Sequence, residues 1–152
     1  MRTLFLGSDH GGFGLKQELV QILTGAGFAV EDCGVNDAAS VDYPDIAEIV
    51  CERVLAVPHS LGILCCGTGI GMSIAANKIA GIRAALCSET YSAKMARVHN
   101  DANVLCLGAR VIGIELAREV ATAFLSVSFE GGRHARRVGK ISELENIDRR
   151  CR

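Results

Sequence analysis

The hydrophobic residues of this 152-residue chain gather in five short runs that do not alternate with polar residues. Continuous apolar runs of this length are typical of parallel strands that are buried on both faces. Most of these runs are followed directly by glycine or by polar residues. The pattern therefore predicts strands at residues 3–7, 28–30, 61–65, 83–87 and 104–108.

Segments with helical periodicity separate these runs. Apolar residues fall on one face of the first two segments, namely Leu15, Leu19, Ile22 and Leu23 in the first and Ile46, Ile49, Val50 and Val54 in the second. Gly25 and Gly27 end the first helix, and the run Asp42-Tyr43-Pro44 opens the second. Three more helices are predicted at residues 72–80, 89–99 and 112–125, the last with an apolar stripe of Leu116, Val120 and Phe124.

Strand and helix alternate five times, which predicts an α/β protein with a Rossmann-like, doubly wound sheet of five parallel strands in a three-layer α/β/α arrangement. Ligand groups should then gather at the carboxyl ends of the strands. A sixth helix is expected from about residue 133 to 149, and it has no further strand to pack beside. We expect this extra C-terminal helix to reach a second subunit, and residues 1–152 to form one domain.

Charge and cysteine usage narrow the possible classes of protein. Sixteen Lys plus Arg against seventeen Asp plus Glu give a net charge of −1, so no overall positive field attracts nucleic acid or anionic lipid. The apolar run that follows Met1-Arg2 is too short for the apolar region of a signal peptide, and no apolar stretch is long enough to span a bilayer. Seven cysteines without a C-x-x-C pair or zinc spacing indicate reduced thiols, no metal site and a cytoplasmic protein.

The loop after the third strand carries the strongest candidate for chemistry. It reads Cys66-Gly67-Thr68-Gly69-Ile70-Gly71 and leads into a helix, so several backbone amides converge on a small volume that suits an oxyanion or a phosphate. The same surroundings favour the thiolate form of Cys66, which is a candidate base or nucleophile. Cys65 should point to the opposite face of the strand and pack in the core. A tight turn without a ligand is the alternative.

Polar side chains at three other places are further candidates. Asp9 and His10 follow the first strand, although Asp9 could simply cap the first helix. The run His99-Asn100-Asp101 ends the fourth helix with groups suited to proton transfer and hydroxyl binding, or merely with a C-cap. Arg133 and Arg137 lie one helical turn apart with His134 beside them, a spacing that suits one phosphate or a solvated basic face.

A nicotinamide-dependent oxidoreductase is the alternative that the architecture suggests. The first-strand loop does not read G-x-G-x-x-G, and the third-strand loop places Met72 where the last glycine belongs. Asp32 nevertheless falls near the end of the second strand, where dinucleotide-binding folds place a ribose-binding acid. The sequence disfavours this reading without excluding it.

Taken together, six blocks along the chain resemble the B-type ribose-5-phosphate isomerases over nearly the whole length. The blocks read GSDHGG, VDYPD, CGTGIGMSIAANK, GIRAA, HNDANVL and GGRH. That family also includes galactose-6-phosphate and allose-6-phosphate isomerases. One of its branches has Glu at the position of Met72, so this chain resembles the branch that uses cysteine.

The resemblance implies a metal-free and cofactor-free dimer or tetramer with its active site between subunits. It assigns Cys66 as the base at C2 of the aldose, amides of residues 67–71 as holders of the enediolate oxygens, and Thr68 as a proton carrier between O1 and O2. It assigns ring opening to His99 and enediolate binding to Asn100, both from the partner subunit. The substrate-binding set it implies is Asp9, His10, Tyr43, Gly67, Gly69, Ile70, Gly71, Asn100, Arg110, Arg133, His134 and Arg137.

These assignments predict an aldose-ketose isomerase of the non-oxidative pentose phosphate pathway, acting on ribose 5-phosphate and ribulose 5-phosphate. Isomerisation of a hexose 6-phosphate such as allose or galactose 6-phosphate is the nearest alternative, because pentose and hexose phosphates differ by one carbon. A module that binds a sugar phosphate or a nucleotide without chemistry is a further alternative.

Overall fold

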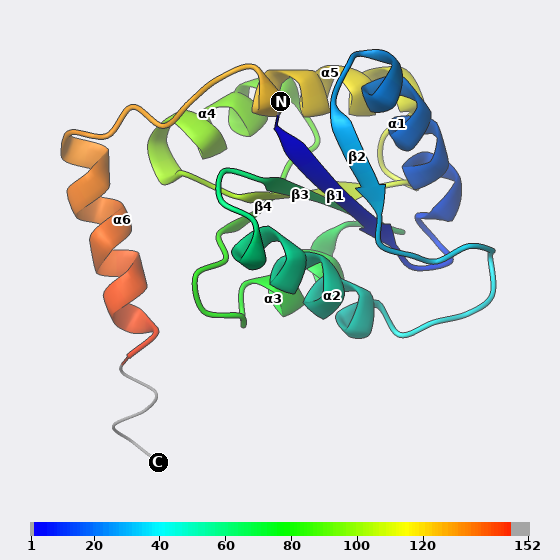
Figure 1. Cartoon of the computed structure of the whole chain (residues 1–152), viewed down its shortest axis with the longest axis horizontal. Helices are drawn as coiled ribbons and strands as arrows, with labels where there is room; N and C mark the ends of the chain where they lie inside the picture. The colour runs from blue at the N-terminus through cyan, green and yellow to red at the C-terminus, as the bar shows by residue number, and fades with distance from the viewer. Residues whose placement is uncertain (1, 147–152) are drawn as a thin grey trace.

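Five parallel strands form the centre of the computed structural model, which describes residues 2–146 (Figure 1). Their order across the sheet is β2-β1-β3-β5-β4. The strands are β1 (Thr3–Ser8), β2 (Ala29–Asp32), β3 (Leu61–Cys66), β4 (Ala84–Leu86) and β5 (Val104–Gly108). All five predicted strands are confirmed to within two residues at either end, and the parallel α/β fold is confirmed with them.

Helices cover both faces of the sheet, which gives the three predicted layers (Figure 1). One face is covered by α1 (Phe13–Gly25), α4 (Thr90–Asn100) and α5 (Ile114–Leu125), and the other by α2 (Tyr43–Ala56) and α3 (Ile70–Ala76). Successive side chains of a strand point to opposite faces, so Leu4 and Leu6 of β1 pack in the first layer and Phe5 packs in the second. Each buried strand therefore contributes to two hydrophobic cores.

The chain changes direction across the sheet at β1. From β1 it moves outward to the edge strand β2, and then it returns to β3 on the other side of β1. The carboxyl ends of β1 and β3 thus lie beside a topological switch point, where open α/β sheets leave a crevice for ligands. The loops there are tightly packed, because a Cβ atom on Gly12 would lie 2.3 Å from the carbonyl oxygen of Cys65.

The third helix differs from the prediction of residues 72–80. Helix α3 begins at Ile70, directly after the glycine-rich loop, and it ends at Ala76. The side chain of Asn77 explains the early end, because its Oδ1 accepts a hydrogen bond from Ala84 N (2.8 Å) and its Nδ2 donates to Ala84 O (2.9 Å). The chain is thereby turned towards β4 instead of continuing the helix.

Two residues predicted on apolar faces point towards solvent. Ile49 of α2 and Leu116 of α5 are exposed, whereas their neighbours Val50 and Ala117 are fully buried. The buried face of each helix is shifted around the helix axis relative to the prediction, because it includes small residues such as Ala47 and Ala121. The periodicity located the helices correctly but assigned the edges of their faces wrongly.

The sixth helix exists but is shorter than predicted within the part of the chain that the structure describes. Helix α6 spans Arg133–Leu144, and the predicted continuation to residue 149 lies partly outside residues 2–146. In Figure 1 this helix stands beside the sheet and its covering helices and belongs to none of the three layers. None of the helices between residues 2 and 146 combines the length and hydropathy of a bilayer-spanning segment.

Candidate active site

The loop between β3 and α3 holds the Cys66 thiol at the carboxyl edge of the sheet. The amide of Gly69 donates a hydrogen bond to Cys66 Sγ over 3.0 Å. The side chain of Cys66 faces the α2 and α3 layer, whereas Cys65 is fully buried in the opposite layer, as the alternation of the strand predicts. The hydrogen bond fixes the position of the sulfur beside the glycine-rich loop.

Further amides of this loop lack an acceptor among the described residues. Among the described residues, the N–H groups of Gly67, Thr68 and Gly71 have no hydrogen-bond partner. Gly69 makes this geometry possible, because its φ of 78° is left-handed and a Cβ there would lie 2.4 Å from Leu86 Cδ1. Backbone donors of this kind are suited to a phosphate or to an oxyanion that develops in a reaction.

The other described cysteines lie in surroundings that keep them protonated. Burial raises the pKa of Cys51 and of Cys65 to about 12, and that of Cys87 to about 11. Burial also raises the pKa of Cys106 well above its ordinary value. Partial burial, followed by the charge of Glu31, raises the pKa of Cys33 to about 11. These thiols are therefore poor nucleophiles at neutral pH.

Several predicted binding residues surround Cys66. The Asp9 carboxylate accepts a hydrogen bond from Gly12 N (3.0 Å), directly before α1, so Asp9 both orders this turn and lies at the switch point. The ring of Tyr43 lies against the loop, since a Cβ on Gly71 would be 2.7 Å from Tyr43 Cζ. The Arg110 guanidinium lies over Gly67, where a Cβ would be 3.3 Å away.

Three other predicted residues at this edge are exposed. The side chains of His10, Thr68 and Ile70 face solvent, and Thr68 Oγ1 accepts a hydrogen bond from Ile70 N over 3.3 Å. Tyr43 and Arg110 are exposed as well, whereas Asp9 and the Cys66 thiol are buried, with Cys66 only 5% exposed. We call all of these residues, with the glycines of the loop, the Cys66 cluster.

A second group of predicted residues, which we call the His99 cluster, lies where α4 ends and α6 begins. The rings of His99 and His134 stack with centroids 4.2 Å apart and an interplanar angle of 8°. Arg133 Nε donates to His134 Nε2 over 3.4 Å, which indicates that this nitrogen is an acceptor in a neutral ring. Burial lowers the pKa of His134, and the charges of His99 and Arg133 lower it further.

The electrostatics of the His99 cluster suit an anion. The ligand atoms of His99, Glu130 and His134 lie within 4.8 Å of one another, which is close enough to consider a metal ion. However, the charges of Arg133 and Arg137 both act on His134, so a second cation there would be repelled. Two arginines one turn apart on α6 match a phosphate group better.

Topology separates the two clusters within one chain. Helix α4 runs back across the parallel sheet, so its last residues lie at the edge where the strands begin, whereas Cys66 lies at the edge where β3 ends. Figure 1 shows the end of α4 and the start of α6 on the side of the sheet opposite the carboxyl ends of the strands. Cys66 and His99 of the same chain therefore do not form one site.

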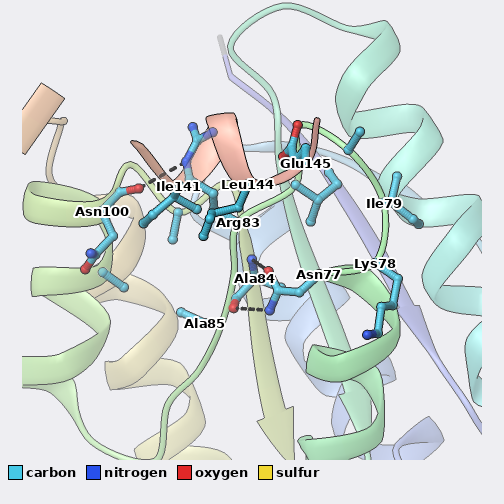
Figure 2. A pocket seen from close by; sticks show the side chains of 14 residues that line it. Asn77, Lys78, Ile79, Arg83, Ala84, Ala85, Asn100, Ile141, Leu144 and Glu145 are labelled. Atoms are coloured by element: carbon cyan, nitrogen blue, oxygen red, sulfur yellow. Dashed lines mark hydrogen bonds between the residues drawn. The ribbon is translucent and has the colours of Figure 1, made fainter. Parts of the chain in front are cut away.

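A wide cavity lies between α6 and the chain that leads into β4 (Figure 2). Its volume is about 920 Å³, and Ile141, Leu144 and Glu145 of α6 form one wall. Asn100 lies at its margin with an exposed side chain. The C-terminal part of α6 touches the rest of the chain where Glu145 Oε1 accepts a hydrogen bond from Gly81 N over 2.9 Å.

A buried ion pair that the sequence patterns did not predict bears on dinucleotide binding. Lys16 is fully buried, and its Nζ contacts Asp32 Oδ1 (2.7 Å), Asp32 Oδ2 (2.8 Å) and Val35 O (2.7 Å). Asp32 also accepts a hydrogen bond from Gly34 N, so its carboxylate is already occupied. A ribose hydroxyl would have to compete with this pair. The available signal was a lysine on the same helical face as Leu19 and Leu23.

The fold and the Cys66 cluster define a class, namely Rossmann-like α/β proteins with a thiol and free amides at the switch point. Comparison of the sequence with known families gives a match to the family described as Ribose/Galactose Isomerase over residues 4–141. The chain belongs to this ribose/galactose isomerase family.

Individual relatives are similar to this chain over nearly the full length of both proteins. Ribose-5-phosphate isomerase B of Escherichia coli is 49% identical over 145 residues, which cover 95% of this chain and 97% of that protein. D-erythrulose-4-phosphate isomerase of Pectobacterium atrosepticum is 43% identical over 150 residues, which cover 98% and 99%. The solved structure of ribose-5-phosphate isomerase B from Clostridium thermocellum superposes with a TM-score of 0.93 at 50% identity, covering 95% and 98% of the two chains.

Proposed function

We propose that this chain is an aldose-ketose isomerase that interconverts ribose 5-phosphate and ribulose 5-phosphate, a reaction of the non-oxidative pentose phosphate pathway. The observation that carries the proposal is the hydrogen bond from the Gly69 amide to Cys66 Sγ, beside the amides of Gly67, Thr68 and Gly71, which have no partner among residues 2–146. A carbon acid next to a carbonyl loses its proton readily only if the enediolate charge meets donors already in position. The relatives named as ribose-5-phosphate isomerases support the choice of substrate.

The chemistry follows from the positions of these groups. His99 protonates the ring oxygen of the furanose as the ring opens, which yields the open-chain aldehyde. Cys66 thiolate then removes the C2 proton, and the loop amides hold the enediolate oxygens. Thr68 carries a proton between O2 and O1, and the Cys66 thiol returns its proton to C1. The products are the ketose and a regenerated thiolate, so atoms and charge balance.

Substrate binding is assigned to two groups of side chains. Asp9, His10 and Tyr43 contact the sugar or its phosphate, and Arg110 adds positive charge above Gly67. Arg133, His134 and Arg137 hold the phosphate, and Asn100 binds the enediolate. The second group comes from a partner subunit, because the two clusters of one chain lie at opposite edges of the sheet. The assembly is thus a homodimer or a homotetramer of one-domain chains.

The chemistry of the chain also supports a proposal for its cellular compartment and its binding partners. The free thiols of six described cysteines favour a reducing compartment such as the cytoplasm. The balanced net charge of −1 gives no attraction to nucleic acid or membrane surfaces. The acid-base groups of the two clusters suffice for the reaction, so neither a metal nor a cofactor takes part.

Comparison of substrates tests which sugar phosphate the site prefers. The relative named D-erythrulose-4-phosphate isomerase acts on a shorter sugar, so the same scaffold carries different specificities. We expect kcat/KM for ribose 5-phosphate to exceed that for allose 6-phosphate and galactose 6-phosphate, measured by ketose formation under identical conditions. A preference for a hexose phosphate would replace the pentose assignment. Saturable binding of all three without ketose formation would show a binding module.

A further inference from the structure

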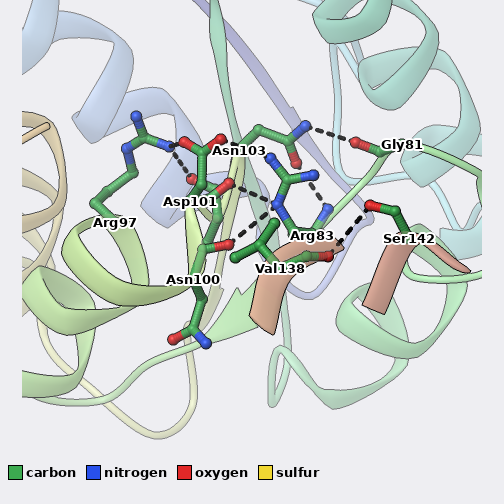
Figure 3. A network of polar contacts seen from close by, with 9 residues as sticks. Gly81, Arg83, Arg97, Asn100, Asp101, Asn103, Val138 and Ser142 are labelled. Carbon is green, nitrogen blue, oxygen red and sulfur yellow. Dashed lines mark hydrogen bonds and ion pairs between the residues drawn. The ribbon is translucent and has the colours of Figure 1, made fainter. Parts of the chain in front are cut away.

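Arg83 is fixed in place by the backbone around it. This residue precedes β4, and its N–H donates to Asn103 Oδ1 over 2.8 Å. The side chain of Asn103 in turn donates to Gly81 O over 2.9 Å, which joins the segment before β4 to the segment before β5 (Figure 3). The backbone of Arg83 is therefore held in a fixed position relative to the sheet.

From this fixed position the Arg83 side chain reaches the end of α4. Its Nε donates to the carbonyl oxygens of Asn100 (3.0 Å) and Asp101 (2.9 Å), and its terminal nitrogen contacts Asp101 Oδ2 over 2.9 Å. Arg97 holds the other side, where its guanidinium contacts Asp101 Oδ1 (2.8 Å) and Ala102 O (2.7 Å). Figure 3 shows Asp101 between the two arginines.

These contacts act on the residues that directly precede Asp101. Asp101 is the C-cap of α4 in a left-handed conformation (φ 46°), which a non-glycine residue rarely adopts without support. The carbonyl groups at a helix C-terminus lack intrahelical donors, and Arg83 supplies one. We infer that Arg83 and Asp101 are positioning residues that hold His99 and Asn100 in the orientation needed for catalysis. This inference rests on the proposed function, in which His99 and Asn100 act on the substrate.

Shielding from water makes this arrangement stronger than a surface ion pair. The side chains of Arg97, Arg83 and Asp101 are 9%, 21% and 33% exposed, respectively. A lysine at position 83 could reach only part of the set, because it lacks the planar fork that contacts two carbonyl oxygens and a carboxylate together. The geometry at the end of α4 thus depends on arginine rather than on charge alone.

The test compares Arg83→Gln in two backgrounds of the full-length chain, the wild type and His99→Asn. In the wild type we expect kcat for ribose 5-phosphate to fall about 10- to 100-fold with KM changed less than about threefold, because displaced catalytic groups slow the chemistry. In the His99→Asn background, whose residual activity is measured at a higher enzyme concentration, the same substitution should cost less, because one of the two groups that Arg83 positions is already gone. Arg118→Gln, which removes an exposed ion pair with Glu115, should leave kcat unchanged.

Asp101→Asn is the second variant, because asparagine tolerates the left-handed conformation and lacks only the charge. It should repeat the pattern of Arg83→Gln, with melting curves confirming that each variant is folded. An equal loss in both backgrounds, or a kcat within about twofold of wild type for both variants, would overturn the inference. A wild-type chain without isomerase activity would instead overturn the proposed function, so the two failures are distinguishable.

Discussion

At the scale of single residues, two side chains of the same type can differ in their hydrogen bonds and packing, because their immediate neighbours differ. Cys65 and Cys66 are adjacent in sequence and both are buried, yet their side chains face opposite layers, and Cys66 Sγ accepts a hydrogen bond from the Gly69 amide. The imidazoles of His99 and His134 are far apart in sequence, but their rings stack on each other in the fold. The chemistry of each group follows from the atoms around it and not from its residue type.

The His134 imidazole should make stability depend on pH. Burial, then the charges of His99 and Arg133, place its folded-state pKa below the ordinary value of 6.5. The unfolded chain therefore binds a proton more readily, so this contribution is fully present above about pH 6.5 and is lost as the pH falls towards the folded-state pKa. Urea denaturation between pH 8 and 5 should show the decline, and His134→Gln should flatten it. Equal slopes for both proteins would contradict this account.

At the scale of elements, short polar contacts fix where helices and loops begin and end. The Lys16–Asp32 pair joins α1 to the end of β2, and the same amine binds Val35 O in the following loop. This pair lies at the carboxyl end of β2, the strand next to β1. It therefore supports the loop that follows β2 by holding it against α1.

Lys16→Met tests this support. The substitution leaves the Asp32 carboxylate without its partner, and removing one member of a buried pair costs about 3–5 kcal/mol. Because Asp32 is 26% exposed, we expect about 3 kcal/mol in the free energy of unfolding. Urea denaturation measures this, and the double variant Lys16→Met/Asp32→Asn should recover part of the loss. A change below about 1 kcal/mol would show that the pair contributes little.

The sequence predicted the strands and helices more accurately than it predicted the residues at which they begin and end. Apolar runs identified all five strands, because a strand buried on both faces is hydrophobic throughout. The end of α3 could not be read from periodicity, since it depends on Asn77 reaching Ala84, a contact made by the fold. Lys16 and Arg83 were missed for the same reason, because their partners lie 16 and 18 residues away. The Cys66 loop was found because its glycines and its cysteine are contiguous.

At the scale of the whole molecule, the arrangement of the two clusters predicts a shared active site. Cys66 lies where β3 ends, and His99 lies at the opposite edge of the sheet (Figure 1). A two-fold dimer would bring the Cys66 cluster of each chain to the His99 cluster of its partner. A monomer would then lack a complete site.

Subunit mixing distinguishes a shared site from a site within one chain. Cys66→Ala and His99→Asn should each be nearly inactive alone, but a mixed dimer holds one site with both native residues. After unfolding and refolding in equal amounts, half of the dimers are mixed, so activity should recover to about one quarter of wild type. No recovery, with mixed dimers confirmed by mass, would show that each chain contains its own complete site.

The most direct test of the account is solvent deuterium uptake at C2 of ribose 5-phosphate, followed by NMR in deuterium oxide. The wild-type protein should exchange this hydrogen at a rate comparable to ketose formation, because the Cys66 thiol passes its proton to solvent in some turnovers. Cys66→Ala should abolish both exchange and ketose formation while calorimetry still detects sugar-phosphate binding. Exchange that persists in Cys66→Ala would contradict the assignment of this sulfur as the base.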